Sequence, residues 1–237
     1  MGRLITADRS IIPACDVPDL VRFQQLIEAT AGVPGLGAYK VGAVLTIRYG
    51  LAALVAAVRD QDKNVPVIYD HQKCGTDIPE MGVQFAAAIK GGGATATIIF
   101  PLSGAKTEVA YIEACKAAGL TVIVGGEMTH PGFKVSDGGF IADEKLEEMY
   151  RIAADNGVVD FVVPGNKPDR VAVYRELLAP LCDDDLTFYA PGFIAQGGVL
   201  SEAGQAAGAR IGAIIGRAIY DADDKRAAAI ECASQIV

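Results

Sequence analysis

Residues 66–100, PVIYDHQKCGTDIPEMGVQFAAAIKGGGATATIIF, contain the pattern that decides the fold. Two short apolar runs rich in β-branched residues, 66–70 and 94–100, are typical of strands. The stretch from Pro79 to Lys90 between them has helical spacing. Strands that are apolar almost throughout occur in parallel sheets, where helices cover both faces. The segment therefore predicts one β-α-β unit.

The same unit repeats in both directions along the chain. Strands are expected at residues 11–15, 38–43, 66–70, 94–100, 121–126, 160–165, 186–192 and 211–216. Helices are expected at residues 19–29, 50–59, 79–90, 106–118, 143–156, 168–178, 201–207 and 222–237. This alternation predicts an α/β fold of the (β/α)8 TIM-barrel type, with residues 1–237 as a single domain. A doubly wound open sheet is the alternative, but it usually has a glycine-rich turn where this chain has ACDVPDL.

The composition excludes several classes of protein. Of the 237 residues, 51% are hydrophobic and 21% charged, which excludes a disordered or fibrous chain. A net charge of −8 without a run of lysines or arginines argues against binding to nucleic acid. Five scattered cysteines without a C-x-x-C pair predict reduced thiols. Because we find neither a membrane-spanning apolar run nor a signal peptide, we expect a cytoplasmic protein that does not act at a membrane.

The first candidate site is the segment YDHQKCGTDIPE, residues 69–80. It places Asp70, Lys73 and Asp77 after a predicted strand, where barrel enzymes carry their functional residues. Two carboxylates beside an ammonium suit a site that keeps a lysine protonated and then delivers its proton. A solvated loop with a surface ion pair is the alternative. Cys74 is a weaker candidate for a nucleophile because no base partner is evident.

Two further segments, PGFIAQGG (191–198) and AIIGRAIY (213–220), predict a phosphate site. The loops after the seventh and eighth strands of a barrel commonly hold a phosphate. Consecutive glycines let backbone N–H groups approach oxygen anions, and Arg217 adds a planar set of donors.

The segment GGEMTHPGF (125–133) offers the Thr129 hydroxyl to a ligand. His130 is either a general base or a structural histidine bonded to the backbone, and His71 has the same two interpretations. Two histidines without a third ligand do not predict a metal site, so we expect none.

In this order, the motifs resemble those of the orotidine 5′-phosphate decarboxylase family over nearly the whole chain. ACDV resembles the family's strand-1 aspartate, YKVG its strand-2 lysine and GEMTHPG its strand-5 loop. PGNKPDR, PGFIAQGG and IIGRAIYDADD resemble the last three strand ends, and the run from Gly126 to Asp223 is the most specific part.

The catalytic motif departs from the family pattern D-x-K-x-x-D-I. Here it reads Asp70-His-Gln-Lys73-Cys-Gly-Thr-Asp77-Ile78, with one residue added on each side of the lysine. Residues three apart in a strand face opposite sides, so Lys73 reaches the site beside Asp70 only where the backbone is irregular at 71–73. Met81 also stands where the family commonly has a threonine that contacts ribose.

The resemblance implies removal of CO2 from orotidine 5′-phosphate, giving UMP for pyrimidine biosynthesis, without metal or organic cofactor. Lys73 would protonate C6, Asp70 would lie near the substrate carboxylate, and Asp77 would enter the neighbouring site of a homodimer with shared active sites. The implied substrate contacts are Asp16 and Lys40 at ribose, Thr129 at the pyrimidine, Ile78 and Pro191 elsewhere on the nucleotide, and Gln196, Gly197, Gly216 and Arg217 at the phosphate.

Two other functions stay open from the sequence. Hexulose-phosphate synthase and keto-gulonate-phosphate decarboxylase share a D-x-K-x-x-D motif but stabilise an enediolate on Mg²⁺. GEMTHPG and AQGG favour the pyrimidine enzyme over these two. A non-catalytic barrel that binds a phosphate ligand is the other alternative, in which the altered spacing marks lost chemistry.

Overall fold

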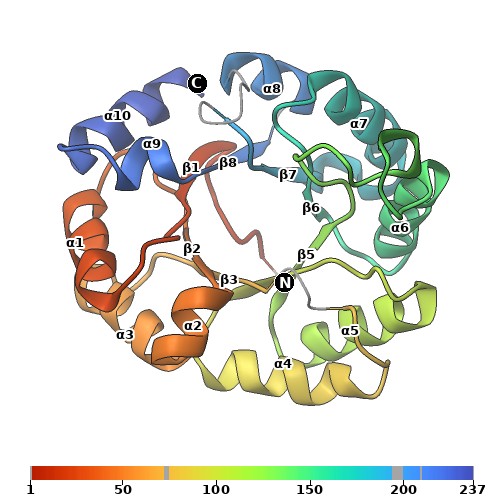
Figure 1. Ribbon diagram of the computed structural model, residues 1–237, viewed down its shortest axis with the longest axis horizontal. Coiled ribbons are helices and arrows are strands. Elements are labelled where there is room, and N and C mark those ends of the chain that lie inside the picture. Colours follow the sequence, from red (N-terminus) through yellow and green to blue (C-terminus); the bar gives the residue numbers. More distant parts are fainter. Residues whose placement is uncertain (1, 72–74, 194–199, 209, 237) are drawn as a thin grey trace.

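The computed structural model describes residues 2–71, 75–193, 200–208 and 210–236. Eight parallel strands form one sheet in the order β1-β8-β7-β6-β5-β4-β3-β2, and the helices surround it (Figure 1). The strands are β1 (Arg9–Pro13), β2 (Tyr39–Gly42), β3 (Val67–Asp70), β4 (Ala96–Ile99), β5 (Thr121–Gly125), β6 (Asp160–Val162), β7 (Thr187–Ala190) and β8 (Ile211–Ile215). The predicted α/β barrel is therefore confirmed.

Ten α-helices and two short 3-10 helices lie within the described ranges. The α-helices are α1 (Leu20–Thr30), α2 (Ala43–Tyr49), α3 (Leu51–Gln61), α4 (Met81–Gly91), α5 (Ala105–Ala117), α6 (Asp143–Asp155), α7 (Pro168–Cys182), α8 (Leu200–Ala207), α9 (Arg217–Tyr220) and α10 (Lys225–Gln235). The 3-10 helices are η1 (Val135–Asp137) and η2 (Asp183–Asp185). Among the described helices, none is long and apolar enough to span a bilayer.

The barrel closes between β1 and β2, where Ile11 pairs with Leu36 in a parallel bridge just before β2. Ala14 pairs with Lys40 in a parallel bridge, and the Cys15 N–H donates to the Lys40 carbonyl at 2.9 Å. This closure brings the chain that leaves β1 beside the end of β2. Asp16 and Lys40, which are 24 positions apart in the sequence, thereby become neighbours in space.

Two apolar layers hold the barrel together. The inner layer fills the barrel and includes Ile12, Ile68, Ile98 and Ile123, whereas the outer layer lies between the strands and the helices. Because side chains alternate along a strand, Asp70 shares the inward face of β3 with Ile68. The pleat therefore directs a carboxylate at the end of this strand into the barrel mouth.

Helix α3 matches the helix predicted at residues 50–59, but a further helix, α2, precedes it and was not predicted. The chain forms α2 and then α3, and Gly50, with φ of +80°, separates them. The seven residues of α2, AVLTIRY, include three β-branched side chains, and its Val44 and Ile47 are 76% and 82% exposed. This composition does not show the amphipathic pattern from which a helix is predicted. The short helix α9 was likewise not predicted, and several predicted strands are shorter than expected.

Candidate active site

A cavity of ≈ 240 Å³ lies at the carboxyl ends of the strands. Residues of all eight strands, or of the segments that directly follow them, line it. Seven predicted site residues are among them: Asp16, Lys40, Asp70, Thr129, Pro191, Gly216 and Arg217. The barrel therefore brings together, at one rim, side chains that are far apart in the sequence.

A row of three charged side chains lies along one wall of this cavity. The Lys40 Nζ is 2.7 Å from Asp70 Oδ2 and 3.7 Å from Asp16 Oδ1. Burial by itself would lower the pKa of Lys40, but the carboxylates of Asp70 and Asp16 outweigh it and hold that pKa above its ordinary value. Lys40 is thus a fixed ammonium between two carboxylates.

Only one carboxylate oxygen of Asp70, Oδ2, takes part in the pair with Lys40. Its Oδ1 is buried and has no hydrogen-bond partner within the described part of the chain. A buried acceptor without a partner costs about 1–3 kcal/mol, so this oxygen favours an additional donor. Lys73, Gln196 and Gly197 lie outside the described residues, and so does most of the backbone predicted to be irregular at 71–73.

The remaining candidates lie apart from this cavity. Asp77 and Ile78 are not among its lining residues, and Ile78 is 58% exposed. The backbone of Asp77 accepts a hydrogen bond from Thr107 Oγ1 at 3.0 Å. His130 is exposed and contacts the Phe133 ring edge-on, while His71 Nδ1 is 2.7 Å from the Tyr69 hydroxyl. Within the described ranges, no three His, Cys, Asp or Glu side chains gather closely enough to hold a metal ion.

A second, larger cavity continues from the same charged row. It has a volume of ≈ 760 Å³ and shares Asp16, Lys40 and Asp70 with the first. Its outer part is lined by Val44 and Ile47 of α2, two of the most exposed apolar side chains among the described residues. The site is therefore open on the side of α2.

Close packing brings Thr129 against the loop that follows β7. A Cβ on Gly192, whose φ is +105°, would lie 3.0 Å from Thr129 Cγ2 and 3.2 Å from Asn166 Oδ1. Both the backbone conformation and the contact favour glycine at this position. The absence of a side chain at residue 192 lets the loops after β5, β6 and β7 meet.

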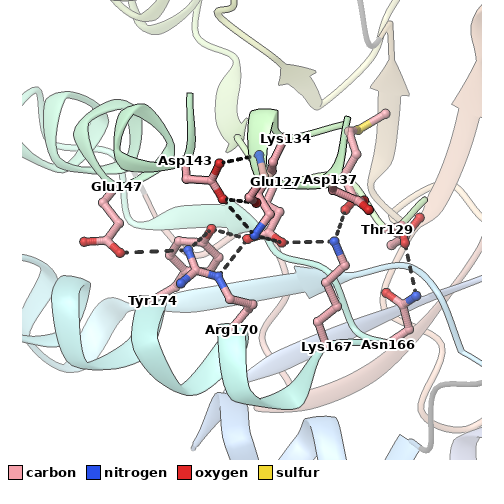
Figure 2. Close-up of polar contacts among 12 residues, drawn as sticks. Glu127, Thr129, Lys134, Asp137, Asp143, Glu147, Asn166, Lys167, Arg170 and Tyr174 are labelled. Atoms are coloured by element: carbon pink, nitrogen blue, oxygen red, sulfur yellow. Dashed lines mark hydrogen bonds and ion pairs between the residues drawn. The ribbon is translucent and has the colours of Figure 1, made fainter. Parts of the chain in front are cut away.

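Behind Thr129 lies a group of polar residues that the sequence analysis did not include among the site residues. We define the Glu127 cluster as Glu127, Lys134, Lys167, Arg170 and Tyr174 (Figure 2). Lys167 Nζ donates to Glu127 Oε1 at 3.0 Å, Arg170 Nε donates to Oε2 at 2.9 Å, and the Tyr174 hydroxyl donates to Oε2. Burial alone would raise the pKa of Glu127, but these hydrogen bonds outweigh it and hold that pKa below its ordinary value.

The sequence contains both halves of this cluster, GEMTHPG and PGNKPDR. The sequence does not show that these two motifs are in contact, since they are about forty positions apart. The pairing of β5 with β6 in the barrel brings them together. The available signal was a glutamate directly after the predicted apolar strand 121–126.

The chain forms a closed (β/α)8 barrel with a charged pocket at its carboxyl rim, an arrangement that is typical of the class of barrel enzymes. Within that class, the chain belongs to the Orotidine 5'-phosphate decarboxylase / HUMPS family, whose model matches residues 9–232. The resemblance inferred from the motifs is confirmed.

Individual relatives are similar over nearly the full chain. Orotidine 5'-phosphate decarboxylase of Methanosarcina barkeri is 32% identical over 226 residues, which cover 95% of this chain and 94% of the relative. The protein of the same name from Pyrococcus abyssi is 30% identical over 226 residues, covering 95% and 98%.

Solved structures also match this fold. The crystal structure of orotidine 5'-phosphate decarboxylase from Pyrococcus horikoshii has a TM-score of 0.78 and 26% identity, and covers 95% of this chain and 98% of its own. The Methanocaldococcus jannaschii structure, complexed with inhibitor BMP, has a TM-score of 0.83 at 24% identity and covers 96% and 98%.

Proposed function

We propose that this chain is a carboxy-lyase that converts orotidine 5′-phosphate to UMP and CO2 in pyrimidine biosynthesis. The observation that carries the proposal is the buried Lys40–Asp70 pair, 2.7 Å apart, at the mouth of a barrel that belongs to this family. The likeness to decarboxylases of the same name over 95% of the chain supports it.

The reaction determines what the protein must supply. When the bond between C6 and the carboxylate breaks, its electron pair stays on C6 in the plane of the ring, where it cannot delocalise into the π system. Stabilisation must therefore come from fixed charges in the site. In this proposal a proton on the Lys73 Nζ moves to C6, and the lysine recovers it from solvent after the product leaves.

Asp70 takes two roles in the proposed site. Its Oδ2 is held by Lys40, whereas its Oδ1 lacks a partner among the described residues and is available to the Lys73 ammonium. The same carboxylate lies close to the substrate carboxylate, so the loss of CO2 removes a like-charge contact.

The other residues bind the nucleotide at a distance from C6. Asp16 and Lys40 bind the ribose hydroxyls, and Thr129 binds the amide edge of the base. Arg217 and the backbone at Gly216, together with Gln196 and Gly197, bind the phosphate, and Pro191 lies beside the nucleotide. Binding of the phosphate dianion contributes energy that assembles the reacting end of the site.

The proposal includes a homodimer with shared active sites. Asp77 and Ile78 do not line the cavity of their own chain, and the larger cavity opens beside the exposed Val44 and Ile47. An apolar surface beside an open site suits contact with a second copy. In the dimer, Asp77 and Ile78 of each chain enter the open side of the other site.

The experiment that tests this function is turnover of orotidine 5′-phosphate, followed as loss of its ultraviolet absorbance, before and after treatment with EDTA. We expect equal turnover in both samples. Activity that EDTA abolishes and Mg²⁺ restores would favour the enediolate chemistry of the related enzymes, and no turnover in either sample would favour a binding protein.

A further inference from the structure

Glu127 has no part in the proposed chemistry, although it lies in the wall of the cavity. Its side chain is fully buried, and a buried ionised carboxylate is stable only when charged or polar donors surround it. Three donors do so here, from Lys167, Arg170 and Tyr174. The Glu127 carboxylate is thus buried, surrounded by donors and close in sequence to the proposed binding residue Thr129. We therefore ask what function this arrangement has.

The contacts connect Glu127, through residues 166 and 167, with the backbone of Met128 and Thr129. The Lys167 ammonium donates to Glu127 Oε1 at 3.0 Å and also to the Met128 carbonyl at 2.9 Å. The neighbouring Asn166 donates from Nδ2 to the Thr129 carbonyl at 3.2 Å. Thus the chain segment that Glu127 binds, 166–170, is the segment that holds residues 128 and 129.

Other contacts fix the two ends of the loop that contains Thr129. At its start, the Gly126 and Glu127 N–H groups both donate to the Tyr150 hydroxyl at 3.2 Å. Near its end, Lys134 Nζ lies 3.8 Å from Glu127 Oε1 and 3.4 Å from Asp143 Oδ1. Figure 2 shows Lys134 between these two carboxylates. The Glu127 carboxylate is therefore the shared partner of Lys134, near the end of the loop, and of the 166–170 segment.

We propose that Glu127 is a positioning residue for recognition of the base: its negative charge keeps Lys167 on the Met128 carbonyl and so holds Thr129 against the pyrimidine. This inference rests on the proposed function, in which Thr129 contacts the base. Without that charge, the cations of Lys134, Lys167 and Arg170 repel one another within a partly buried cluster. Lys167 then moves toward solvent, and the loop loses the contact that sets the position of Thr129.

The variant Glu127→Gln removes the charge and keeps the size of the side chain. We expect it to weaken binding of UMP roughly tenfold, the effect of losing about one hydrogen bond to the base. Ribose 5-phosphate has the sugar and the phosphate but no base, so its affinity should stay within about twofold of wild type. Calorimetric titration with each ligand measures the two effects separately. A merely structural defect would weaken both ligands alike.

A double-mutant cycle tests whether Glu127 acts through Thr129. Thr129→Ala should weaken UMP binding, and adding Glu127→Gln to it should cause little further loss, because both changes remove the same contact. Glu148→Gln is the matched control, since it removes the same charge from the exposed face of α6 and should leave both affinities unchanged. If Glu127→Gln does not fold, Lys167→Met at the half-buried lysine tests the same bridge and should show the same base-specific loss.

Three results would overturn the inference: unchanged UMP affinity in Glu127→Gln, equal weakening of UMP and ribose 5-phosphate, or full additivity with Thr129→Ala. Failure of the wild-type protein to bind UMP is a different result. It would contradict the proposed function itself, because the positioning role is measured only as a difference between variants that bind.

Discussion

Lys40 and Arg217 are two cations of the same site that have different surroundings. Lys40 of β2 is held by two carboxylates and is buried with Asp70, so its ammonium is fixed before a substrate arrives. Arg217 follows Gly216, after β8, in the wall of the same cavity and is exposed to solvent. A fixed cation suits orientation of the ribose hydroxyls, and an accessible cation suits capture of the phosphate.

We expect Arg217→Ala to act mainly on KM. Loss of a charge-assisted hydrogen bond to a bound dianion costs on the order of 2–5 kcal/mol, so KM should rise by one to several powers of ten. Steady-state kinetics with orotidine 5′-phosphate measures the change, with Arg151→Ala, an exposed arginine of α6, as control. A wild-type KM in Arg217→Ala would show that Arg217 does not bind the phosphate.

The types of residue in the candidate site could be predicted from the sequence, but the contacts between them could not. Asp16, Lys40 and Asp70 could be assigned because Asp16 directly follows a predicted strand, Lys40 lies within one and Asp70 ends one. The spacing between Asp70 and Lys73 could not be converted into geometry, since one added residue reverses the face of a strand and a bulge restores it. Glu127 was missed because its role depends on Lys167 and Arg170, which reach it only in the folded barrel.

At the scale of elements, the Tyr150 hydroxyl joins α6 to the ends of two strands. It accepts from the Gly126 and Glu127 N–H groups after β5 and donates to the Val162 carbonyl of β6 at 2.7 Å. Tyr150→Phe leaves these buried groups without a partner, and each such group costs about 1–3 kcal/mol. We expect unfolding in urea to show a loss of roughly 3 kcal/mol. A loss below about 0.5 kcal/mol, the size of a neutral surface change, would contradict this role.

Another buried group, Glu108 of α5, makes stability depend on pH. Neither of its carboxyl oxygens has a hydrogen-bond partner in the described part of the chain, and burial, with Glu148 nearby, raises the pKa from 4.5 to about 8. Because the pKa of Glu108 is higher in the folded state, protonation of this carboxyl group favours folding. This contribution to the free energy of unfolding is complete below pH 4.5 and is lost as the pH rises through about 8.

Glu108→Gln should therefore raise the Tm above that of wild type at about pH 9, and the difference should shrink toward about pH 5. Thermal unfolding across this range measures the effect. An equal difference at both ends of the range would mean that Glu108 is not protonated in the folded protein.

The elements themselves were predictable where their pattern was regular. Each of the eight strands overlaps a predicted apolar run, because a strand covered on both faces needs mostly apolar side chains. Helix α2 was not predictable, since it exposes Val44 and Ile47 instead of burying one apolar face. In the proposed dimer those two side chains lie near the second copy, which is information that one chain does not contain.

At the scale of the whole molecule, shared active sites predict complementation between inactive chains. Mixing Lys73→Ala chains with Asp77→Ala chains should restore activity, because one site of each heterodimer then combines an intact Lys73 with an intact Asp77. Turnover of the mixture, with heterodimers isolated by two affinity tags, measures the recovery. Inactive heterodimers would contradict the sharing of sites between copies.

The central claim is that Lys73 delivers the proton to C6 in spite of its altered spacing from Asp70. The most direct measurement compares turnover of orotidine 5′-phosphate by Lys73→Ala and Gln72→Ala. We predict that Lys73→Ala loses nearly all turnover, while Gln72→Ala keeps most of it, since a glutamine amide is not a useful proton donor to a carbanion. The reverse ranking would contradict the account, because the group that protonates C6 would then not be Lys73.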